Sequence, residues 1–147
     1  MTASRGMEKS AGNADFLLSE HLRLSEVEYS ALALRHGISN RVELSNTAIA
    51  RLFLMAVRFE QIRKCLGGRP LVLTSGYRCQ DLNEVMPGAA KLSRHRVLLA
   101  IDVRPRISAR RALRRVVKLP FVVYAYRNSP RSLHIQWIDI FTGVTDD

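Results

Sequence analysis

The chain has 147 residues, of which 47% are hydrophobic, enough for one domain with a packed core. It carries 23 Lys and Arg against 13 Asp and Glu, and aromatic residues make up only 7%. The net charge of +10 favours an anionic partner, while the scarcity of aromatics argues against a stacking platform for single-stranded nucleic acid. No run reaches the roughly 20 apolar residues of a membrane span.

The start of the chain is polar and rich in small residues. It lacks the apolar stretch of a signal peptide, so we expect synthesis in the cytoplasm without an export signal. Residues 1–15 are predicted to form a disordered arm and residues 16–147 a single domain, which we expect to be monomeric. Cys65 and Cys79 form no C-x-x-C pattern, which favours a reducing compartment without a disulfide.

Two helices are expected in the first half. Residues 16–22 lead into a helix from about Ser25 to His36, with Ser25 and Glu28 as a capping box and Gly37 as its end. A longer helix is predicted over residues 46–66, because its apolar residues recur with the 3.6-residue period and two glycines follow.

The second half is predicted to contain most of the strands. The expected elements are a buried strand at 71–74, a short helix at 80–85, a strand at 97–103, an arginine-rich helix capped by Ser108, and strands at 121–126 and 133–138. Helices first and strands later predict an α+β fold, with N-terminal helices packed on a small, mainly antiparallel sheet.

Three residues in this half suggest a metal site. His95 and Asp102 flank the apolar run 97–101, and His134 lies within a second apolar run. Two imidazoles and one carboxylate suit a catalytic zinc whose fourth position is left for water. A simpler interpretation stays open for each residue. A histidine in an apolar strand is more often a hydrogen-bonded core residue, and a buried Asp102 could pair with an arginine.

Several segments occur in an order that resembles a known family. They are Leu24-Ser25-Glu26, residues 35–40, Thr74-Ser75-Gly76-Tyr77-Arg78 with Leu82-Asn83, Ser93-Arg94-His95 with Ala100-Ile101-Asp102, and Leu133-His134-Ile135. Together they resemble the zinc D-alanyl-D-alanine carboxypeptidase family, whose fold is shared with the Hedgehog signalling domain, and in particular its short, phage-encoded branch. The likeness covers roughly Leu22 to Trp137.

This resemblance implies that His95, Asp102 and His134 bind zinc. It also implies that Arg78 holds a carboxylate or carbonyl of a peptide substrate, although a surface ion pair with Glu84 or Asp81 is the alternative. Ser93 is grouped with Arg78 as a substrate-binding residue; from the residues alone it either supports the ligand histidine through a hydrogen bond or, more simply, caps a loop. Gly76 is expected to serve a tight backbone turn.

The chain departs from the family pattern where a catalytic carboxylate is expected, shortly before the last histidine. Residues 126–133 contain no acid, and Arg127 or Arg131 occupies that position, depending on the alignment. An arginine cannot accept a proton at neutral pH, although one facing the metal could stabilise an oxyanion. An acid from elsewhere, Glu84 or Asp139, is the other option. Two further departures are Arg94 in place of a glutamine and Leu98 in place of a glycine.

Three functions therefore compete. The first is a zinc peptidase of peptidoglycan peptides, of carboxypeptidase or endolysin type, acting in phage lysis or entry and hence in the host cell or on the virion. The second is a catalytically inactive zinc-fold binding module. The third is a basic phage protein associated with nucleic acid. Residues 91–131 hold twelve Lys and Arg and a single acid, Asp102, which suits an anionic envelope polymer or a nucleic acid.

Overall fold

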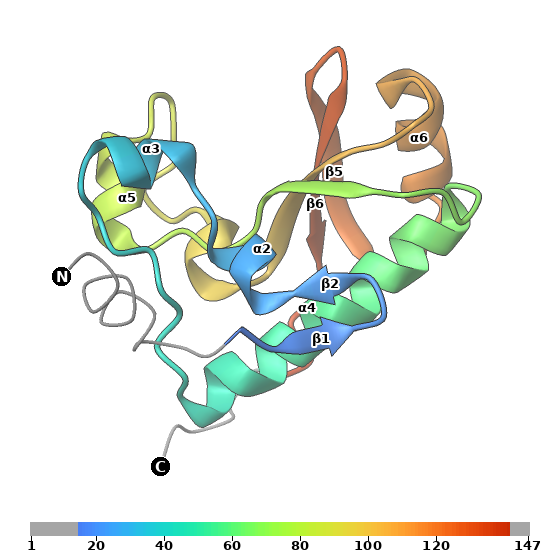
Figure 1. Cartoon of the computed structure of the whole chain (residues 1–147). Helices are drawn as coiled ribbons and strands as arrows, with labels where there is room; N and C mark the ends of the chain where they lie inside the picture. Colours follow the sequence, from blue (N-terminus) through green and yellow to red (C-terminus); the bar gives the residue numbers. More distant parts are fainter. Residues whose placement is uncertain (1–14, 142–147) are drawn as a thin grey trace, which may run out of the picture.

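The computed structural model describes residues 15–141 (Figure 1). Most of the predicted disordered arm, residues 1–14, lies outside the described residues, as do residues 142–147. In chain order the elements are β1 (Leu17–Ser19), β2 (Leu22–Arg23), α2 (Leu24–Glu28), α3 (Ala31–Arg35), α4 (Asn46–Cys65), β3 (Val72–Ser75), α5 (Gln80–Val85), the 3₁₀ turn η1 (Arg94–Val97), β4 (Ala100–Arg104), α6 (Ala109–Val116), β5 (Val122–Ser129) and β6 (Ser132–Trp137).

The larger sheet has the strand order β3-β4-β6-β5, and each neighbouring pair in it is antiparallel. This arrangement confirms the predicted α+β fold with a small antiparallel sheet. In the central pair Ile101 lies opposite Ile135 and Asp102 lies opposite His134. Because strand side chains alternate between faces, the isoleucine pair and the Asp–His pair point to opposite sides of the sheet.

One face of the sheet forms the hydrophobic core. Ile101, Val103, Leu133 and Ile135 are fully buried there in one cluster with the apolar side of α4. Helix α4 begins as predicted, with the Ser45 hydroxyl accepting from the Ala48 N–H, and Gly67 and Gly68 adopt positive φ beyond its end. Figure 1 shows α4 running beneath the sheet, with the β1–β2 hairpin beside it. The opposite face of β4 and β6 is left for polar side chains.

The predicted helix from Ser25 to His36 is wrong, because two short helices occupy this region. Tyr29 is extended (φ −65°, ψ 134°), and the Ser30 hydroxyl caps a new helix, α3. The predicted capping box of Ser25 and Glu28 is also wrong. Glu26 caps the backbone of Arg23, while the Glu28 carboxylate accepts from the distant Val42 N–H.

The predicted strand at 97–103 begins later, at Ala100. Residues 94–97 form η1, and Leu98, at its end, has a left-handed backbone (φ 64°). The leucine side chain is nevertheless buried in the core. The family that this chain resembles carries glycine at the position of Leu98. Glycine adopts this left-handed conformation without steric cost.

Cys65 and Cys79 are not joined in a disulfide, as expected. The Cys79 sulfur instead accepts from the Leu82 N–H at the start of α5. Within residues 15–141, no helix combines the length and the apolar character needed to cross a bilayer.

Candidate metal centre

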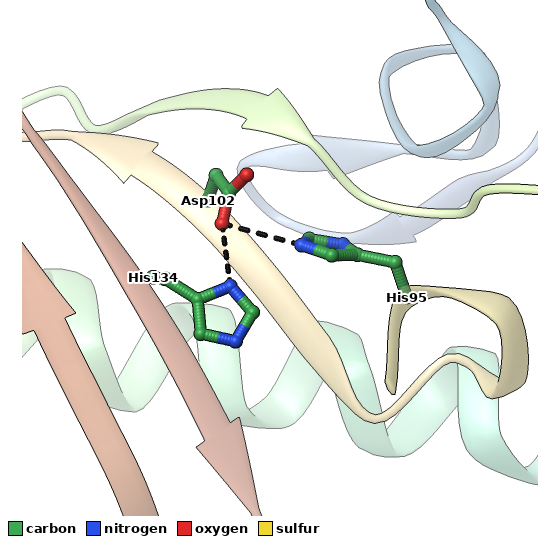
Figure 2. Close-up of side chains that lie close together, drawn as sticks. All are labelled: His95, Asp102 and His134. Atoms are coloured by element: carbon green, nitrogen blue, oxygen red, sulfur yellow. Dashed lines mark hydrogen bonds and ion pairs between the residues drawn. The ribbon is translucent and has the colours of Figure 1, made fainter. Parts of the chain in front are cut away.

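The three predicted ligands come together on the polar face of the sheet (Figure 2). Asp102 comes from β4, His134 from the neighbouring position on β6, and His95 from η1, which precedes β4. Each residue contributes one potential ligand atom, and these atoms all lie within 4.8 Å of one another. The two imidazole rings are 5.1 Å apart between centroids.

A single carboxylate oxygen joins the two histidines. Oδ1 of Asp102 lies 2.8 Å from Nδ1 of His134 and 3.2 Å from Nε2 of His95. All three side chains are largely buried, since His95 is only 2% exposed and His134 only 7%. Burial alone would raise the pKa of the Asp102 carboxyl, but hydrogen bonds from His134 and His95, and their charges, lower this pKa well below its usual range. Asp102 is therefore ionised at neutral pH.

The orientation of His95 is informative about what the site holds. Its Nδ1 lies 2.8 Å from the carbonyl oxygen of Gly76, which can only accept, so Nδ1 carries a proton. In a neutral ring, Nε2 would then point a lone pair at the carboxylate of Asp102. Two lone pairs that face each other, from Nε2 of His95 and Oδ1 of Asp102, repel at 3.2 Å unless a positive charge lies between them or on one of them. Without metal, a proton on Nε2 of His95 supplies that charge; with metal, a divalent cation bound by two nitrogens and one oxygen supplies it, and this donor set suits zinc.

His134 is also fixed by contacts beyond the three ligands. Its Nε2 lies 2.9 Å from Nε2 of Gln136, the next residue on the same face of β6. The ring of Tyr126, directly across from it on β5, lies 4.9 Å away between centroids. Partners of this kind orient a ligating histidine and set which nitrogen carries the proton.

Gly76 positions His95 through a close approach of two backbones. A Cβ added at Gly76 would lie 2.9 Å from both Cα and the carbonyl oxygen of Val27 in α2. The next N–H along, that of Tyr77, donates to the same Val27 carbonyl at 2.8 Å. The glycine is therefore required for contact with α2, and not for the turn predicted from sequence, since its φ is not positive.

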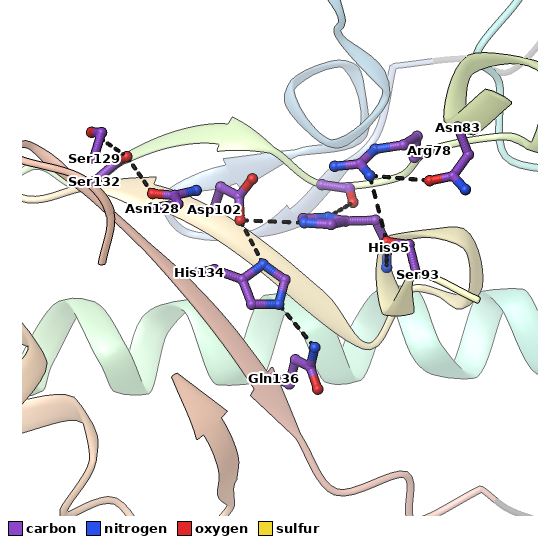
Figure 3. A network of polar contacts seen from close by, with 11 residues as sticks. Arg78, Asn83, Ser93, His95, Asp102, Asn128, Ser129, Ser132, His134 and Gln136 are labelled. Carbon is purple, nitrogen blue, oxygen red and sulfur yellow. Dashed lines mark hydrogen bonds and ion pairs between the residues drawn. The ribbon is translucent and has the colours of Figure 1, made fainter. Parts of the chain in front are cut away.

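Arg78 lies beside His95, the ligand supplied by η1 (Figure 3). The side chain is only 8% exposed, and Nη1 donates to Oδ1 of Asn83 at 3.1 Å and to Oγ of Ser93 at 3.5 Å. The alternative ion pair with Asp81 or Glu84 is not formed in the described part of the chain. Burial lowers the pKa of Arg78, which the nearby Asp102 partly offsets, but a guanidinium stays charged in proteins.

The ligands and Arg78 open into one cavity of about 520 Å³. Its lining includes Asp102, His95, His134 and Gln136, together with Tyr124, Tyr126 and Asn128 of β5. The loop from Met86 to Ser93 supplies further lining residues. Ser93 acts both as the cap of η1, accepting from the His95 N–H, and as a partner of Arg78. The expected cap is therefore formed, while a contact of Ser93 with substrate stays a prediction.

The candidates for a missing catalytic acid lie elsewhere. Asp139 forms an ion pair with Arg51 at 2.8 Å, and Glu84 is exposed on α5; neither lines the cavity. Arg127 lies opposite Leu133, so it is on the other face of the sheet from His134, and Arg131 is in the β5–β6 turn. Of the described residues that line this cavity, Asp102 is the only acid.

Sequence reasoning missed the supporting residues. Asn40 donates to the carbonyls of Glu28 and Tyr77 and accepts from the Cys79 N–H, so it holds the segment that carries Arg78. Asn83 pairs with Arg78 and also donates to the Ala90 carbonyl. Both asparagines lie within the segments that carry the family resemblance, and this was the available sign of their role. Tyr126 and Gln136 could be found only by counting along β5 and β6 from His134.

Comparison with known proteins gives one result. A family model described as Peptidase M15 matches residues 20–136, a span that includes all three metal-ligand candidates and Arg78. No curated protein and no solved structure matches the chain.

Proposed function

Because this chain belongs to the peptidase M15 family, we propose that it is a zinc peptidase that hydrolyses the peptides of peptidoglycan, acting as a monomer. The observation that supports this most is the shared cavity, in which three converging ligand atoms lie beside a buried arginine that has no carboxylate partner among the described residues. A metal site beside a buried guanidinium suits a substrate that presents both a carbonyl and a negative charge.

His95, Asp102 and His134 would hold the metal. Bound there, zinc supplies a Lewis acid that polarises a carbonyl and makes water more acidic. The protein's part is to keep the ligands in place. The Gly76 carbonyl fixes the His95 ring, and β4–β6 pairing fixes Asp102 relative to His134. Such preorganisation lets the site act without rearranging its own dipoles.

Arg78 would bind the C-terminal carboxylate of the peptide. Nη1 is occupied by Asn83 and Ser93, while the buried Nε has no hydrogen-bond partner in the described part of the chain. A guanidinium binds a carboxylate through two parallel N–H groups, which orients as well as attracts it. This contact favours peptides with a free carboxyl end, such as those ending in D-alanyl-D-alanine. It disfavours cleavage at the internal peptide bonds of an endolysin substrate.

The same cavity supports a second candidate, a module that binds zinc and peptide without cutting. The observation in its favour is that no acid besides Asp102 lines the cavity among residues 15–141, so no carboxylate is available as a general base. Loss of a general base costs about 10²–10⁴-fold in rate.

The site of action follows from the substrate. We propose that the protein reaches the cell wall during phage infection, through a holin or on the virion, which would suit the phage-type resemblance of the sequence. Its basic surface would retain it there on an anionic envelope polymer.

The test is release of D-alanine from a stem pentapeptide ending in D-alanyl-D-alanine, with zinc added. The wild-type protein should release D-alanine, and His95→Ala should not. Arg78→Lys should raise KM by about 10–100-fold, since a hydrogen bond to a charged group is worth about 1.5–3 kcal/mol. Arg69→Lys, an exposed arginine outside the cavity, is the matched control. Zinc binding with no release, from this peptide or from whole peptidoglycan, would favour the inactive module.

A further inference from the structure

The strand opposite His134 presents tyrosines to the cavity where a carboxylate was expected. Tyr126 lies directly across from His134, and Tyr124 lies opposite Gln136. Both tyrosines line the cavity, and their rings are 5.3 Å apart. Asn128, the third residue of β5 that lines the cavity, already accepts from the Ser132 hydroxyl (Figure 3).

Of these three residues, Tyr126 is the one best placed to take part in catalysis. Its ring packs against the ligand His134, and its phenol is close enough to Asp102 and Arg78 for both charges to act on it. The side chain remains 40% exposed, so a ligand in the cavity can reach it. A phenol is a hydrogen-bond donor at neutral pH and a poor proton acceptor.

We propose that Tyr126 is a catalytic residue whose O–H donates a hydrogen bond to the oxygen that becomes negative when water adds to the scissile carbonyl; this rests on the proposed peptidase function. In that step a C–O bond forms and the carbonyl π pair moves to the oxygen. The water loses a proton to solvent, and the nitrogen takes one from solvent. The oxygen's electron pair then re-forms the C=O bond as the C–N bond breaks, and the nitrogen leaves as an amine. Tyr126 keeps its own proton throughout.

This role explains how the cavity can work without a second carboxylate. Stabilising the developing charge lowers the barrier without any proton acceptor in the protein, and such donors are often the largest single contribution to catalysis. Arg78 cannot easily serve both purposes, because its side chain is committed to Asn83 and Ser93 and to the substrate carboxylate. Tyr124 has a phenol too, but it lies opposite Gln136 and not opposite a metal ligand.

The experiment compares Tyr126→Phe with Tyr29→Phe in the full-length, zinc-loaded protein; Tyr29 is exposed and lies outside the cavity. Both changes remove only a hydroxyl and keep the ring, so the packing on His134 is preserved. For Tyr126→Phe we expect kcat on the D-alanyl-D-alanine pentapeptide to fall about 10–100-fold with KM within about twofold. The phosphinate analogue of D-alanyl-D-alanine, which carries the charged tetrahedral oxygen, should bind about 10–100-fold more weakly by calorimetry. Tyr29→Phe should leave the phosphinate affinity within about twofold.

The two proposals fail in different ways. If the wild-type protein hydrolyses the peptide and Tyr126→Phe does so equally fast, the role of Tyr126 is overturned while the peptidase function stands. Equal phosphinate affinity of wild type and Tyr126→Phe overturns it as well, as does a wild-type protein that does not bind the phosphinate. A parallel loss of zinc affinity in Tyr126→Phe would assign the effect to the metal site and overturn the role in charge stabilisation.

Discussion

Asp102 and His134 lie directly opposite each other on β4 and β6, and Oδ1 of one is 2.8 Å from Nδ1 of the other. His95 reaches the same oxygen from η1, outside the two strands. A cation held by these atoms would join the two central strands to the segment before them. Metal binding should therefore contribute to the stability of the fold as well as to the chemistry of the site.

The first prediction is that zinc raises the thermal stability of the protein. At a free zinc concentration of about 100 times Kd, the gain is about 2.7 kcal/mol, or roughly 5–10 °C in Tm for a domain of this size. A chelator should reverse it. Asp102→Asn keeps the shape of the side chain but removes the charge, and should abolish most of the shift in a thermal melt. His36→Ala, an exposed histidine at the end of α3, is the control and should keep it. An equal shift in Asp102→Asn would contradict this assignment of the site.

A second prediction concerns Gln136. For Nδ1 of His134 to ligate a metal, the proton of this ring must be on Nε2, 2.9 Å from the Gln136 amide. The amide oxygen can accept that proton after a half-turn of the amide group. Gln136→Leu should therefore weaken zinc binding about 10–100-fold, in line with the loss of other such partners. Gln136→Glu, a stronger acceptor, should retain wild-type affinity. Competition with a chromogenic chelator measures both, and unchanged affinity in Gln136→Leu would exclude this role.

Much of the site could be predicted because it depends on strand geometry. The apolar runs around Asp102 and His134 predicted two strands, and the pairing of these strands in the structure places both polar residues on one face. The residue of β5 that lies opposite His134 could not be predicted. The pairing register between β5 and β6 depends on a turn and on irregularities in the ladder. The family pattern drew attention to Arg127 and Arg131, while Tyr126 is the residue opposite His134.

The N-terminal half was harder to predict for a different reason. The break between α2 and α3 comes from tertiary contacts of residues that are far apart in sequence. Glu28 accepts from the Val42 N–H and the Val27 carbonyl accepts from the Tyr77 N–H, so the end of α2 is held by partners that local propensity does not reveal. A continuous helical pattern over residues 25–36 carried no sign of either contact.

A third prediction concerns the backbone strain at Leu98. Its φ of 64° costs an L-residue roughly 1–2 kcal/mol, whereas glycine adopts it freely. Leu98→Ala and Leu98→Gly both remove a buried side chain and should both destabilise the protein, by about 2–5 kcal/mol. Leu98→Gly should be the more stable of the two, by about 0.5–1 kcal/mol, the reverse of the usual order. Urea denaturation of the pair tests this; a more stable alanine variant would show that the left-handed backbone is not strained.

A fourth prediction is a pH dependence at Glu60, which anchors the β1–β2 hairpin to α4. Its carboxylate accepts from the Ser19 hydroxyl and from both the backbone and the ring of His21. Burial raises the pKa of Glu60, but these hydrogen bonds outweigh it and leave the pKa below its usual value. A carboxyl with a lowered folded pKa stabilises the protein above the unfolded pKa of about 4.3, and this stability is lost as the pH falls through the folded pKa.

Glu60→Gln should therefore cost about 1–2 kcal/mol at pH 7, and much less near pH 3. Urea denaturation at the two pH values measures the difference. Glu20→Gln is the control, because Glu20 is 84% exposed and only approaches His21 at 3.8 Å. Its effect should stay below about 0.5 kcal/mol at either pH. A cost of Glu60→Gln that is the same at both pH values would refute the titration of this carboxylate.

The last prediction concerns the basic surface of α6. Arg110 and Arg114 of α6 and Lys118, in the turn just after it, follow one another at four-residue spacing and are exposed. Ala109, Ala112 and Val116 are buried on the other side of the helix. Residues 103–138 contain nine Lys and Arg and no acid. Since no ion pair among the described residues neutralises this row, we expect it to bind a wall polymer with phosphodiester groups, such as teichoic acid, through its charge.

Changing these three cations to glutamine should weaken retention on walls that carry the polymer, and should make retention less sensitive to salt. A protein with Arg35, Arg41 and Arg69 changed to glutamine has the same net charge but keeps the α6 row, and should be retained like the wild type. Because counterion release makes such binding fall steeply with salt, retention that ignores salt would exclude the charged surface. Tighter binding to duplex DNA than to the wall polymer, lost in the same α6 variant, would instead favour the nucleic-acid role over the envelope.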